Sequence, residues 1–309
     1  MMKKTCGSIY SALTISVIMQ SEGVLVNMRI KHRFAFGTRK INVVQSLEQQ
    51  GVELDISYGI AVFEIFEDND KFNAISDLMS SNNITSIPTA IYTKEEIEAA
   101  QWLTVRSSWR SLYPQPIDDF GFLRTTYDAT DYCEKAKGSD GLLYWCGNGL
   151  VQKENFILAK EPNWGPRNFL MVNCVEDELF ISPKTEETLR TSDLSGFEIY
   201  DVLNKKRNVM SGVKQLFVKN YLGEGLCDSA ILKKMTCPKC GYTKYILKAG
   251  ANCFSKEAFE GVREDIIKSK EKIGGMACFN LIIVTHKFYD VITKAKLDRG
   301  LVFEPVELI

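Results

Sequence analysis

Apolar and polar residues follow two different periods along residues 28–127. A period of two, together with short apolar runs, predicts strands over residues 30–36, 52–66, 87–92 and 102–105. Apolar spacings of three and four residues predict helices over residues 41–50, 72–79 and 93–100. Thr93 and Glu96 form a capping box at the start of the third helix. This alternation of strands and helices indicates a small α+β domain.

Residues 106–132 interrupt the alternation. The segment is rich in aromatic residues and contains Pro114 and Pro116, so we expect a loop without a helix. Its aromatic side chains would hold it on the protein surface, and the alternative is a binding loop. A second rigid turn places Trp164 near Arg167. These residue types either anchor a protein interface or pack into the domain.

One order of elements occurs twice in the second half of the chain. Residues 179–202 and 281–306 each predict a strand, a short amphipathic helix, a glycine and an alternating strand. Gly196 and Gly300 stand where the end of a helix needs a residue with positive φ. Two copies are too few for a solenoid. They indicate a pseudo-symmetric domain, or two related halves that share a core.

The predicted fold is therefore α+β, with an N-terminal domain over residues 28–127 and a C-terminal domain over residues 128–309. Residues 1–27 stand apart from both. Two lysines there precede a short apolar run that polar residues break and that no A-x-A cleavage site follows. We expect a disordered leader or an over-long start at this point. No later apolar run is long enough to span a bilayer, so no membrane partner is expected.

Composition narrows the possible functions. The net charge of -1, from 38 basic and 39 acidic residues, provides no basic excess for binding phosphates, which disfavours nucleic acid as a partner. Only two histidines, His32 and His286, are available for catalysis. The acidic residues 118–119 and 176–178 are expected at solvated turns, and no phosphate-binding glycine loop or nucleophile elbow is present. Nine cysteines, an odd number without disulfide-scaffold spacing, indicate a reducing compartment and a cytoplasmic protein.

The strongest chemical motif is Cys237-Pro-Lys-Cys240-Gly241. Its spacing directs two thiolates toward one point, and Gly241 allows the backbone to close a tight turn around a metal ion. Zinc takes four ligands in a structural site, so a second pair must come from elsewhere. Two alternatives remain open for this motif: a decayed site with free thiols, and a redox-active dithiol. The second fits less well, because a strand and not a helix is predicted after the turn.

Cys146 and Cys133 are the predicted second pair of zinc ligands. Cys146 is followed by Gly147, as in the second half of a knuckle, but Leu143 stands where the first cysteine is expected. Cys133 precedes Cys146 by 13 residues and could replace that ligand from across a loop. The fallback ligands are Cys227, Cys253, Cys278 and His286. Cys174 and Cys278 lie in apolar runs and are expected in the core.

A cysteine-glycine knuckle, a strand–helix–strand unit, the Cys-Pro-Lys-Cys-Gly knuckle and a second strand–helix–strand unit follow one another in this order. The order resembles the bacterial double Cys-x-x-Cys-Gly motif proteins, over roughly residues 128–309. Cys237 and Cys240 match the second motif of that family, whereas Cys146 matches half of the first. Some members of the family act as immunity proteins beside polymorphic toxins.

Three functions follow from these observations. The resemblance implies a non-enzymatic protein-binding module, an immunity protein that neutralises a cognate toxin and contains a structural zinc ion. The first alternative is a thiol-dependent or otherwise unfamiliar hydrolytic enzyme that uses Cys146 or Cys240. The second is a zinc ribbon that binds nucleic acid, because several lysines surround the knuckle: Lys233, Lys234, Lys239 and Lys244.

Overall fold

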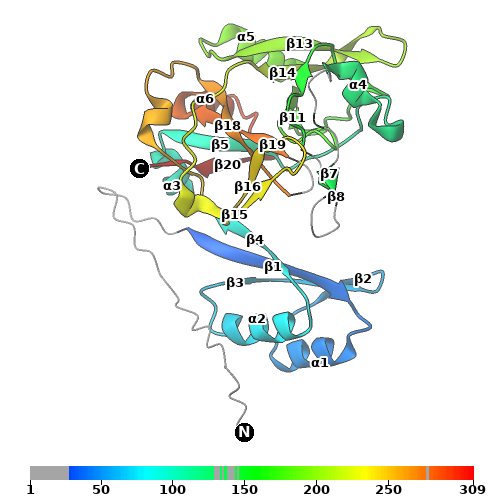
Figure 1. The fold of residues 1–309 in the computed structure, drawn as a ribbon, viewed down its shortest axis with the longest axis vertical. Coiled ribbons are helices and arrows are strands. Elements are labelled where there is room, and N and C mark those ends of the chain that lie inside the picture. Colours follow the sequence, from blue (N-terminus) through cyan, green and yellow to red (C-terminus); the bar gives the residue numbers. More distant parts are fainter. Residues whose placement is uncertain (1–27, 129–132, 134–135, 138–142, 145, 276–277) are drawn as a thin grey trace.

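The structure is a computed structural model that describes residues 28–309, except 129–132, 134–135, 138–142, 145 and 276–277 (Figure 1). The fold is α+β, as predicted. The expectation for residues 1–27 lies outside the described part of the chain. Within that part, no helix has the length and apolar character needed to cross a membrane.

The N-terminal unit is a four-stranded antiparallel sheet in the order β2-β3-β1-β4. Helices α1 and α2 cover the face of the sheet that points away from the rest of the chain (Figure 1). Alternate residues of β1 and β3, such as Phe34 and Phe63, pack against Leu47 of α1 and Ile75 of α2. The elements are β1 (Arg29–Gly37), α1 (Ile41–Gln49), β2 (Asp55–Ser57), β3 (Ile60–Phe66), α2 (Phe72–Ser81) and β4 (Ser86–Ile91).

A tight turn divides the strand that we predicted over residues 52–66. Tyr58 and Gly59 both have positive φ, 49° and 76°, which is the conformation that a two-residue hairpin turn requires. The Thr38 amide and hydroxyl both donate to the Gly59 carbonyl, at 2.9 and 3.1 Å. A tyrosine is an uncommon residue at the first turn position. The turn therefore could not be predicted from the sequence.

The largest sheet has six strands in the order β15-β16-β18-β19-β5-β20. Strand β5 lies between β19 and β20 and is antiparallel to both. The boundary that we placed after residue 127 therefore differs from the arrangement of the sheets, because β5 belongs with the C-terminal part. The elements are α3 (Lys94–Ala99), β5 (Trp102–Ser107), β15 (Ile231–Thr236), β16 (Thr243–Leu247), β18 (Ile266–Ile273), β19 (Phe279–Thr285), α6 (His286–Lys294) and β20 (Leu301–Pro305).

A five-stranded sheet in the order β10-β13-β14-β12-β11 forms the other half of the C-terminal part. Strand β14 lies between β12 and β13 and is antiparallel to both. The elements are β10 (Ile157–Leu158), β11 (Phe169–Leu170), β12 (Leu179–Ile181), α5 (Pro183–Thr191), β13 (Phe197–Asn204) and β14 (Val209–Val218).

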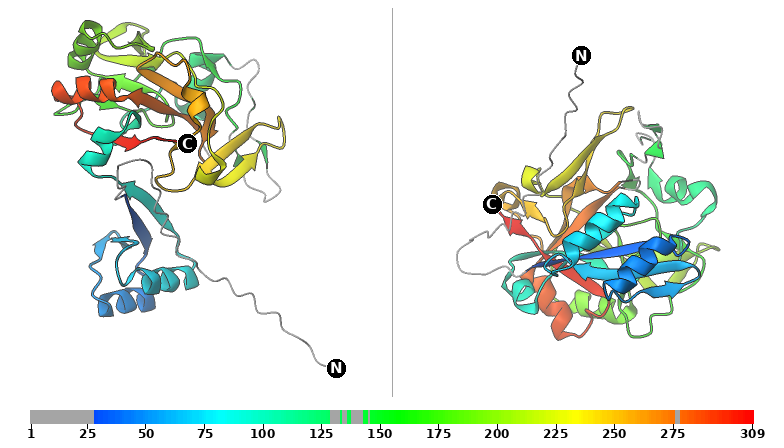
Figure 2. Two further views of the ribbon diagram at one scale, coloured as in Figure 1. Left: turned by 90° about the vertical axis from the view of Figure 1, so that its left-hand side faces the viewer. Right: turned by 90° about the horizontal axis from the view of Figure 1, so that it is seen from below.

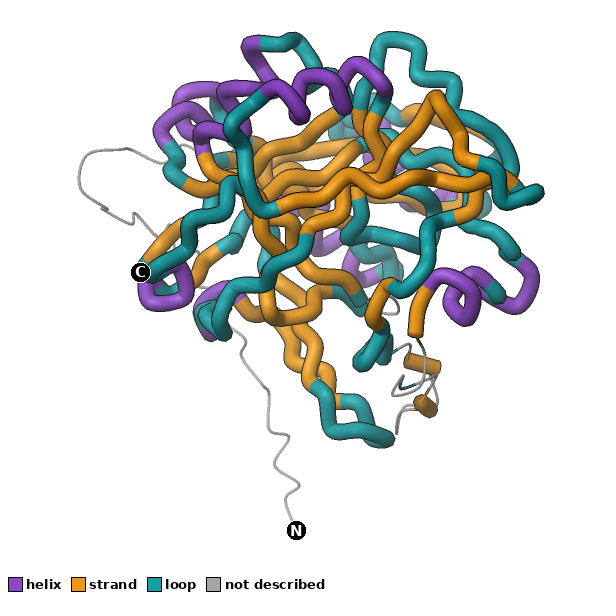
Figure 3. Tube along the Cα trace, turned by 90° about the horizontal axis from the view of Figure 1, so that it is seen from above, coloured by secondary structure: helices purple, strands orange, loops and turns teal. Residues whose placement is uncertain are grey.

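The two predicted repeats have the expected order of elements, β12-α5-β13 and β19-α6-β20. In each, one antiparallel strand separates the two parallel ones, β14 in the first and β5 in the second. Leu189 of α5 and Phe288 of α6 pack into one continuous core that both sheets share. Figure 3 shows helical segments along one side of the central strands and further helical segments on the other sides.

Short elements complete the described chain. Helix α4 (Phe122–Thr126) lies in the segment that we expected to contain no helix. Pro116 lies six residues before the helix begins, so its missing amide hydrogen does not interrupt the helical hydrogen bonds. The short strands are β6 (Tyr127–Asp128), β7 (Ala136–Lys137), β8 (Leu143–Tyr144), β9 (Val151–Gln152), β17 (Cys253–Phe254) and β21 (Glu307–Leu308). The 3-10 helices are η1 (Asp118–Phe120), η2 (Asp228–Ala230) and η3 (Lys256–Phe259).

Candidate metal centre

Four cysteine sulfur atoms converge at one end of the six-stranded sheet. The Sγ atoms of Cys133, Cys146, Cys237 and Cys240 all lie within 4.8 Å of one another. The Cys133–Cys237 sulfur distance is 3.7 Å, and the Cys146–Cys240 distance is 3.4 Å. Four thiolates placed about 2.3 Å from one metal ion have sulfur–sulfur edges of about 3.8 Å in a tetrahedron. The group therefore has the size of a four-sulfur metal site.

The turn between β15 and β16 holds the first pair of sulfurs. The Cys237 amide donates to the Tyr242 carbonyl at 2.9 Å, and the Gly241 amide donates to the Cys237 carbonyl at 2.9 Å. Gly241 has a φ of 75°. Any other residue there would be strained, although no atom would contact an added Cβ. The hairpin therefore fixes the separation of Cys237 and Cys240 through its backbone.

A second hairpin brings Cys133 and Cys146 together. Strands β7 and β8 pair antiparallel between the two cysteines, so 13 residues of chain return to one point. The Cys133 amide donates to the Asn148 carbonyl at 2.9 Å, which closes the base of this loop. The residue at the missing motif position, Leu143, lies in β8. Cys133 supplies the position that the incomplete first motif lacks.

Burial and hydrogen bonds act in opposite directions on these thiols. Burial raises the pKa of Cys133 to about 11, and burial also raises the pKa of Cys146. Burial acts in the same direction on Cys237, but hydrogen bonds from the Cys240 and Lys239 backbone, together with those from the Cys240 and Cys133 thiols, lower the pKa of Cys237 to about 7. Cys240 is exposed, whereas the other three cysteines are buried. The knuckle backbone thus favours the thiolate form of Cys237, which a metal ligand requires.

Groups from β16, β18 and the start of β19 surround the four sulfurs. The Lys272 ammonium donates to the Gly147 carbonyl at 2.8 Å, and the Cys278 thiol donates to the Cys146 carbonyl. A Cβ atom on Gly147 would lie 2.9 Å from the Cys278 sulfur, so only glycine fits at this close approach. Lys244 is buried and donates to the Gly275 carbonyl. Two cations therefore lie around a site that four thiolates would make negative.

The fallback ligands lie outside the four-sulfur group. Cys227 and Cys253 form a separate pair, in which the Cys227 amide donates to the Cys253 carbonyl at 3.0 Å. The His286 ring contacts the Ala100 carbonyl at 3.1 Å and lies 3.5 Å from Asp290. Cys174, which we expected in the core, is exposed and has a φ of 68°, because a turn follows the buried residues before it.

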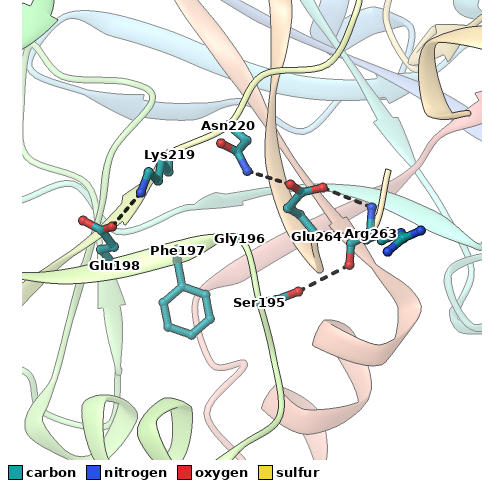
Figure 4. Close-up of a pocket in the computed structure, with 8 residues that line it drawn as sticks. All are labelled: Ser195, Gly196, Phe197, Glu198, Lys219, Asn220, Arg263 and Glu264. Atoms are coloured by element: carbon teal, nitrogen blue, oxygen red, sulfur yellow. Dashed lines mark hydrogen bonds and ion pairs between the residues drawn. The ribbon is translucent and has the colours of Figure 1, made fainter. Parts of the chain in front are cut away.

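A hollow of about 350 Å³ lies between β13 and the start of β18 (Figure 4). Lys219 pairs with Glu198 across it at 3.0 Å, and the Asn220 amide donates to the Glu264 carboxylate at 2.6 Å. The Ser195 hydroxyl donates to Asp265 at 3.0 Å, and the same carboxylate also accepts from the Ser195 amide at 2.9 Å and the Thr285 hydroxyl at 3.0 Å. The described lining of this hollow contains no histidine or cysteine, and the hydrogen bonds of its polar groups fit a structural role.

The expectation of a solvated turn at residues 176–178 is wrong for its last residue. Glu178 is buried and pairs with the buried Lys268 of β18 at 2.5 Å. Gln215 of β14 donates to the other Glu178 oxygen at 2.9 Å. The pair links the two sheets of the C-terminal part. Its sequence signal, a glutamate directly before an apolar strand, was too weak to identify it.

Trp164 packs into the protein. Its indole donates to the Gly212 carbonyl at 2.7 Å, its ring meets Trp109 edge-on at 5.5 Å, and Arg167 lies over Trp109. This settles the alternative for that turn in favour of a packed tryptophan.

Comparisons with protein-family models, with curated proteins and with solved structures give no match to this chain. The resemblance to double Cys-x-x-Cys-Gly proteins accordingly stays a prediction that rests on the residues themselves.

Proposed function

We propose that Cys133, Cys146, Cys237 and Cys240 bind one zinc ion with a structural role. The observation that carries this proposal is the convergence of the four sulfurs within 4.8 Å. An all-sulfur tetrahedral set suits zinc, and four protein ligands leave no position for a substrate or an activated water molecule. The ion would join two hairpins whose described strands are only two to six residues long.

We further propose that the protein is a non-enzymatic binding protein, an immunity protein that neutralises a cognate toxin. The double-knuckle arrangement of the sequence supports this assignment. A closed four-sulfur centre is also consistent with a rigid binding surface. The cytoplasm, where thiols stay reduced, is the compartment in which such a site persists.

The thiol-enzyme alternative has one observation in its favour, the lowered pKa of Cys237. A catalytic cysteine also needs an adjacent base. The described hydrogen bonds of His32 go to Ser86 and Glu67, and those of His286 go to Ala100, so neither ring contacts a thiol. The same lowered pKa is what a metal-binding thiolate needs, so we favour the metal site.

The test of the binding function uses the protein encoded next to this gene in its source genome. Expression of that neighbour alone is expected to stop growth, and co-expression with this chain is expected to restore it. The two proteins should purify together in a fixed ratio. A C174S variant, changed at an exposed cysteine outside the centre, is the control and should protect as well as the wild type. Normal growth with the neighbour alone, or no complex, would contradict an immunity function.

A further inference from the structure

The hairpin of β15 and β16 and the residues that flank it carry a local excess of positive charge. Residues 229–256 contain six lysines and no aspartate or glutamate. The remainder of the chain has 32 basic and 39 acidic residues and therefore a net charge of -7. This charge separation places a positive element on an otherwise acidic molecule.

The lysines of this hairpin are mostly accessible. Lys233 and Lys239 are exposed and form no ion pair within the described part of the chain. Lys234 pairs with the exposed Asp228 at 2.8 Å, and Lys248 donates to the Ser229 carbonyl at 2.7 Å. Strand β15 is the outer strand of its sheet, and both views of Figure 2 show the yellow hairpin projecting from the body of the protein.

Two simpler roles account for only part of this charge. Lysines on an outer strand prevent unwanted pairing with other sheets. However, Lys239 lies in the turn, beyond β15. A zinc ion with four thiolates has a net charge of -2, which the buried Lys244 and the half-buried Lys272 next to the site would balance. The exposed lysines remain as an unused positive surface.

We propose that this hairpin, residues 231–247, is the docking surface for an acidic surface of a partner protein. The proposal rests on the proposed binding function and names the face and the charge of the partner. Leu232 supports it with an apolar contact at the same place. Its side chain is 66% exposed, and it is the extra residue of a bulge opposite β16. Charged rims around an apolar contact are the usual composition of protein interfaces.

A protein partner fits this surface better than a nucleic acid does. A phosphate backbone is long and uniformly charged, so it would continue past the hairpin onto the acidic remainder of the molecule and be repelled there. A compact acidic patch on a protein can match the hairpin alone.

The test uses a short fluorescent oligo-L-glutamate peptide as the compact acidic probe, with binding measured by anisotropy at low salt. K233E/K239E is compared with K205E/K206E, which makes the same charge change at an exposed turn between β13 and β14. Zinc content and circular dichroism establish that both variants keep the fold. We expect the wild type and K205E/K206E to bind alike, and K233E/K239E to bind roughly tenfold more weakly or worse.

Two results of this assay would overturn the proposal. One is equal loss of binding in the two variants, or no loss in K233E/K239E. The other is tighter binding of a duplex oligonucleotide than of the oligo-L-glutamate peptide at the same ionic strength, which would make nucleic acid the partner. Neither result depends on a toxin, so the docking surface and the immunity function fail separately. If the neighbour-encoded protein bound K233E/K239E as tightly as the wild type, the binding function would stand, but the hairpin would not be its docking surface.

Discussion

At the scale of single residues, the buried Lys268–Glu178 pair connects the two sheets of the C-terminal part. Both side chains are less than about one-tenth exposed, and Gln215 adds a hydrogen bond to the same carboxylate. A buried ion pair costs desolvation energy when it forms, and it becomes far more costly when one partner is removed. The pair therefore fixes how β18 lies against the end of β14 and the start of β12.

K268M is expected to lower the free energy of unfolding by about 3–5 kcal/mol, because it leaves Glu178 buried without a counter-charge. The double variant K268M/E178L removes both charges and should recover part of that loss. Urea denaturation measures both. K234M, at the exposed pair with Asp228, is the control and should cost about 1 kcal/mol or less. If K268M were as mild as K234M, the pair would not hold the sheets together.

At the scale of single residues, the sequence predicted the cysteines whose spacing is set by metal coordination. Cys237 and Cys240 are placed by a local turn, and Cys133 was identified because a four-ligand site needs one more thiol. The sequence did not predict the environment of residues whose burial depends on contacts with distant parts of the chain. Glu178 meets Lys268 across 90 residues, and Cys174 follows an apolar run yet emerges at a turn. No local pattern contains that information.

At the scale of elements, each strand–helix–strand unit has a glycine at the equivalent position, and the surroundings of the two glycines differ. Gly196 and Gly300 have φ values of 95° and 88°, and each ends the loop that follows its helix. An added Cβ on Gly196 would overlap the Ile266 carbonyl oxygen, whereas on Gly300 it would lie 3.6 Å from the flexible Arg167 side chain. The first glycine therefore packs directly against the backbone of β18, whereas the neighbour of the second is a side chain that can move.

We expect G300A to cost about 1 kcal/mol, from the positive φ alone. G196A should cost about 3 kcal/mol or more, because overlap with backbone is added to the same strain. Thermal or urea unfolding of the two variants compares them directly. Equal losses would show that the contact with β18 contributes nothing.

The element order of both repeats, the strand segments of the N-terminal unit and the strand after the knuckle could be predicted, because each has its own periodicity or glycine. The insertion of β5 between β19 and β20 could not. Strand β5 is 170 or more residues from its partners, and its apolar sequence fits either sheet. Sheet membership was decided by tertiary packing.

At the scale of the whole molecule, the N-terminal sheet and the metal centre lie in separate cores. The N-terminal core consists of residues from β1, β3, α1 and α2, and the sulfur cluster packs with Tyr242 elsewhere. Tyr92 donates to the Gly250 carbonyl at 2.8 Å, one of the contacts from the strand end of the N-terminal unit to the C-terminal part. Loss of the metal should therefore act locally.

Removal of zinc with a chelator is expected to increase deuterium uptake over residues 231–247 and 146–152, since the ion joins the hairpin of β15 and β16 to Cys146. Uptake over residues 29–66 should stay unchanged. Hydrogen–deuterium exchange with mass spectrometry resolves the regions in one experiment. An equal rise in uptake over residues 29–66 and over the metal-binding segments would show that the ion stabilises the whole chain. No rise in any of these regions would contradict a structural role for the ion.

The central claim, one zinc ion held by four cysteines, is tested most directly by X-ray absorption at the zinc edge on freshly purified, reduced protein with a measured metal content. We predict about one zinc ion per chain, surrounded by four sulfur atoms at about 2.3 Å. C133S should lose one of these sulfurs or the ion itself, and C174S should match the wild type. A chain without zinc, a shell containing nitrogen or oxygen, or an unchanged spectrum for C133S would contradict the account.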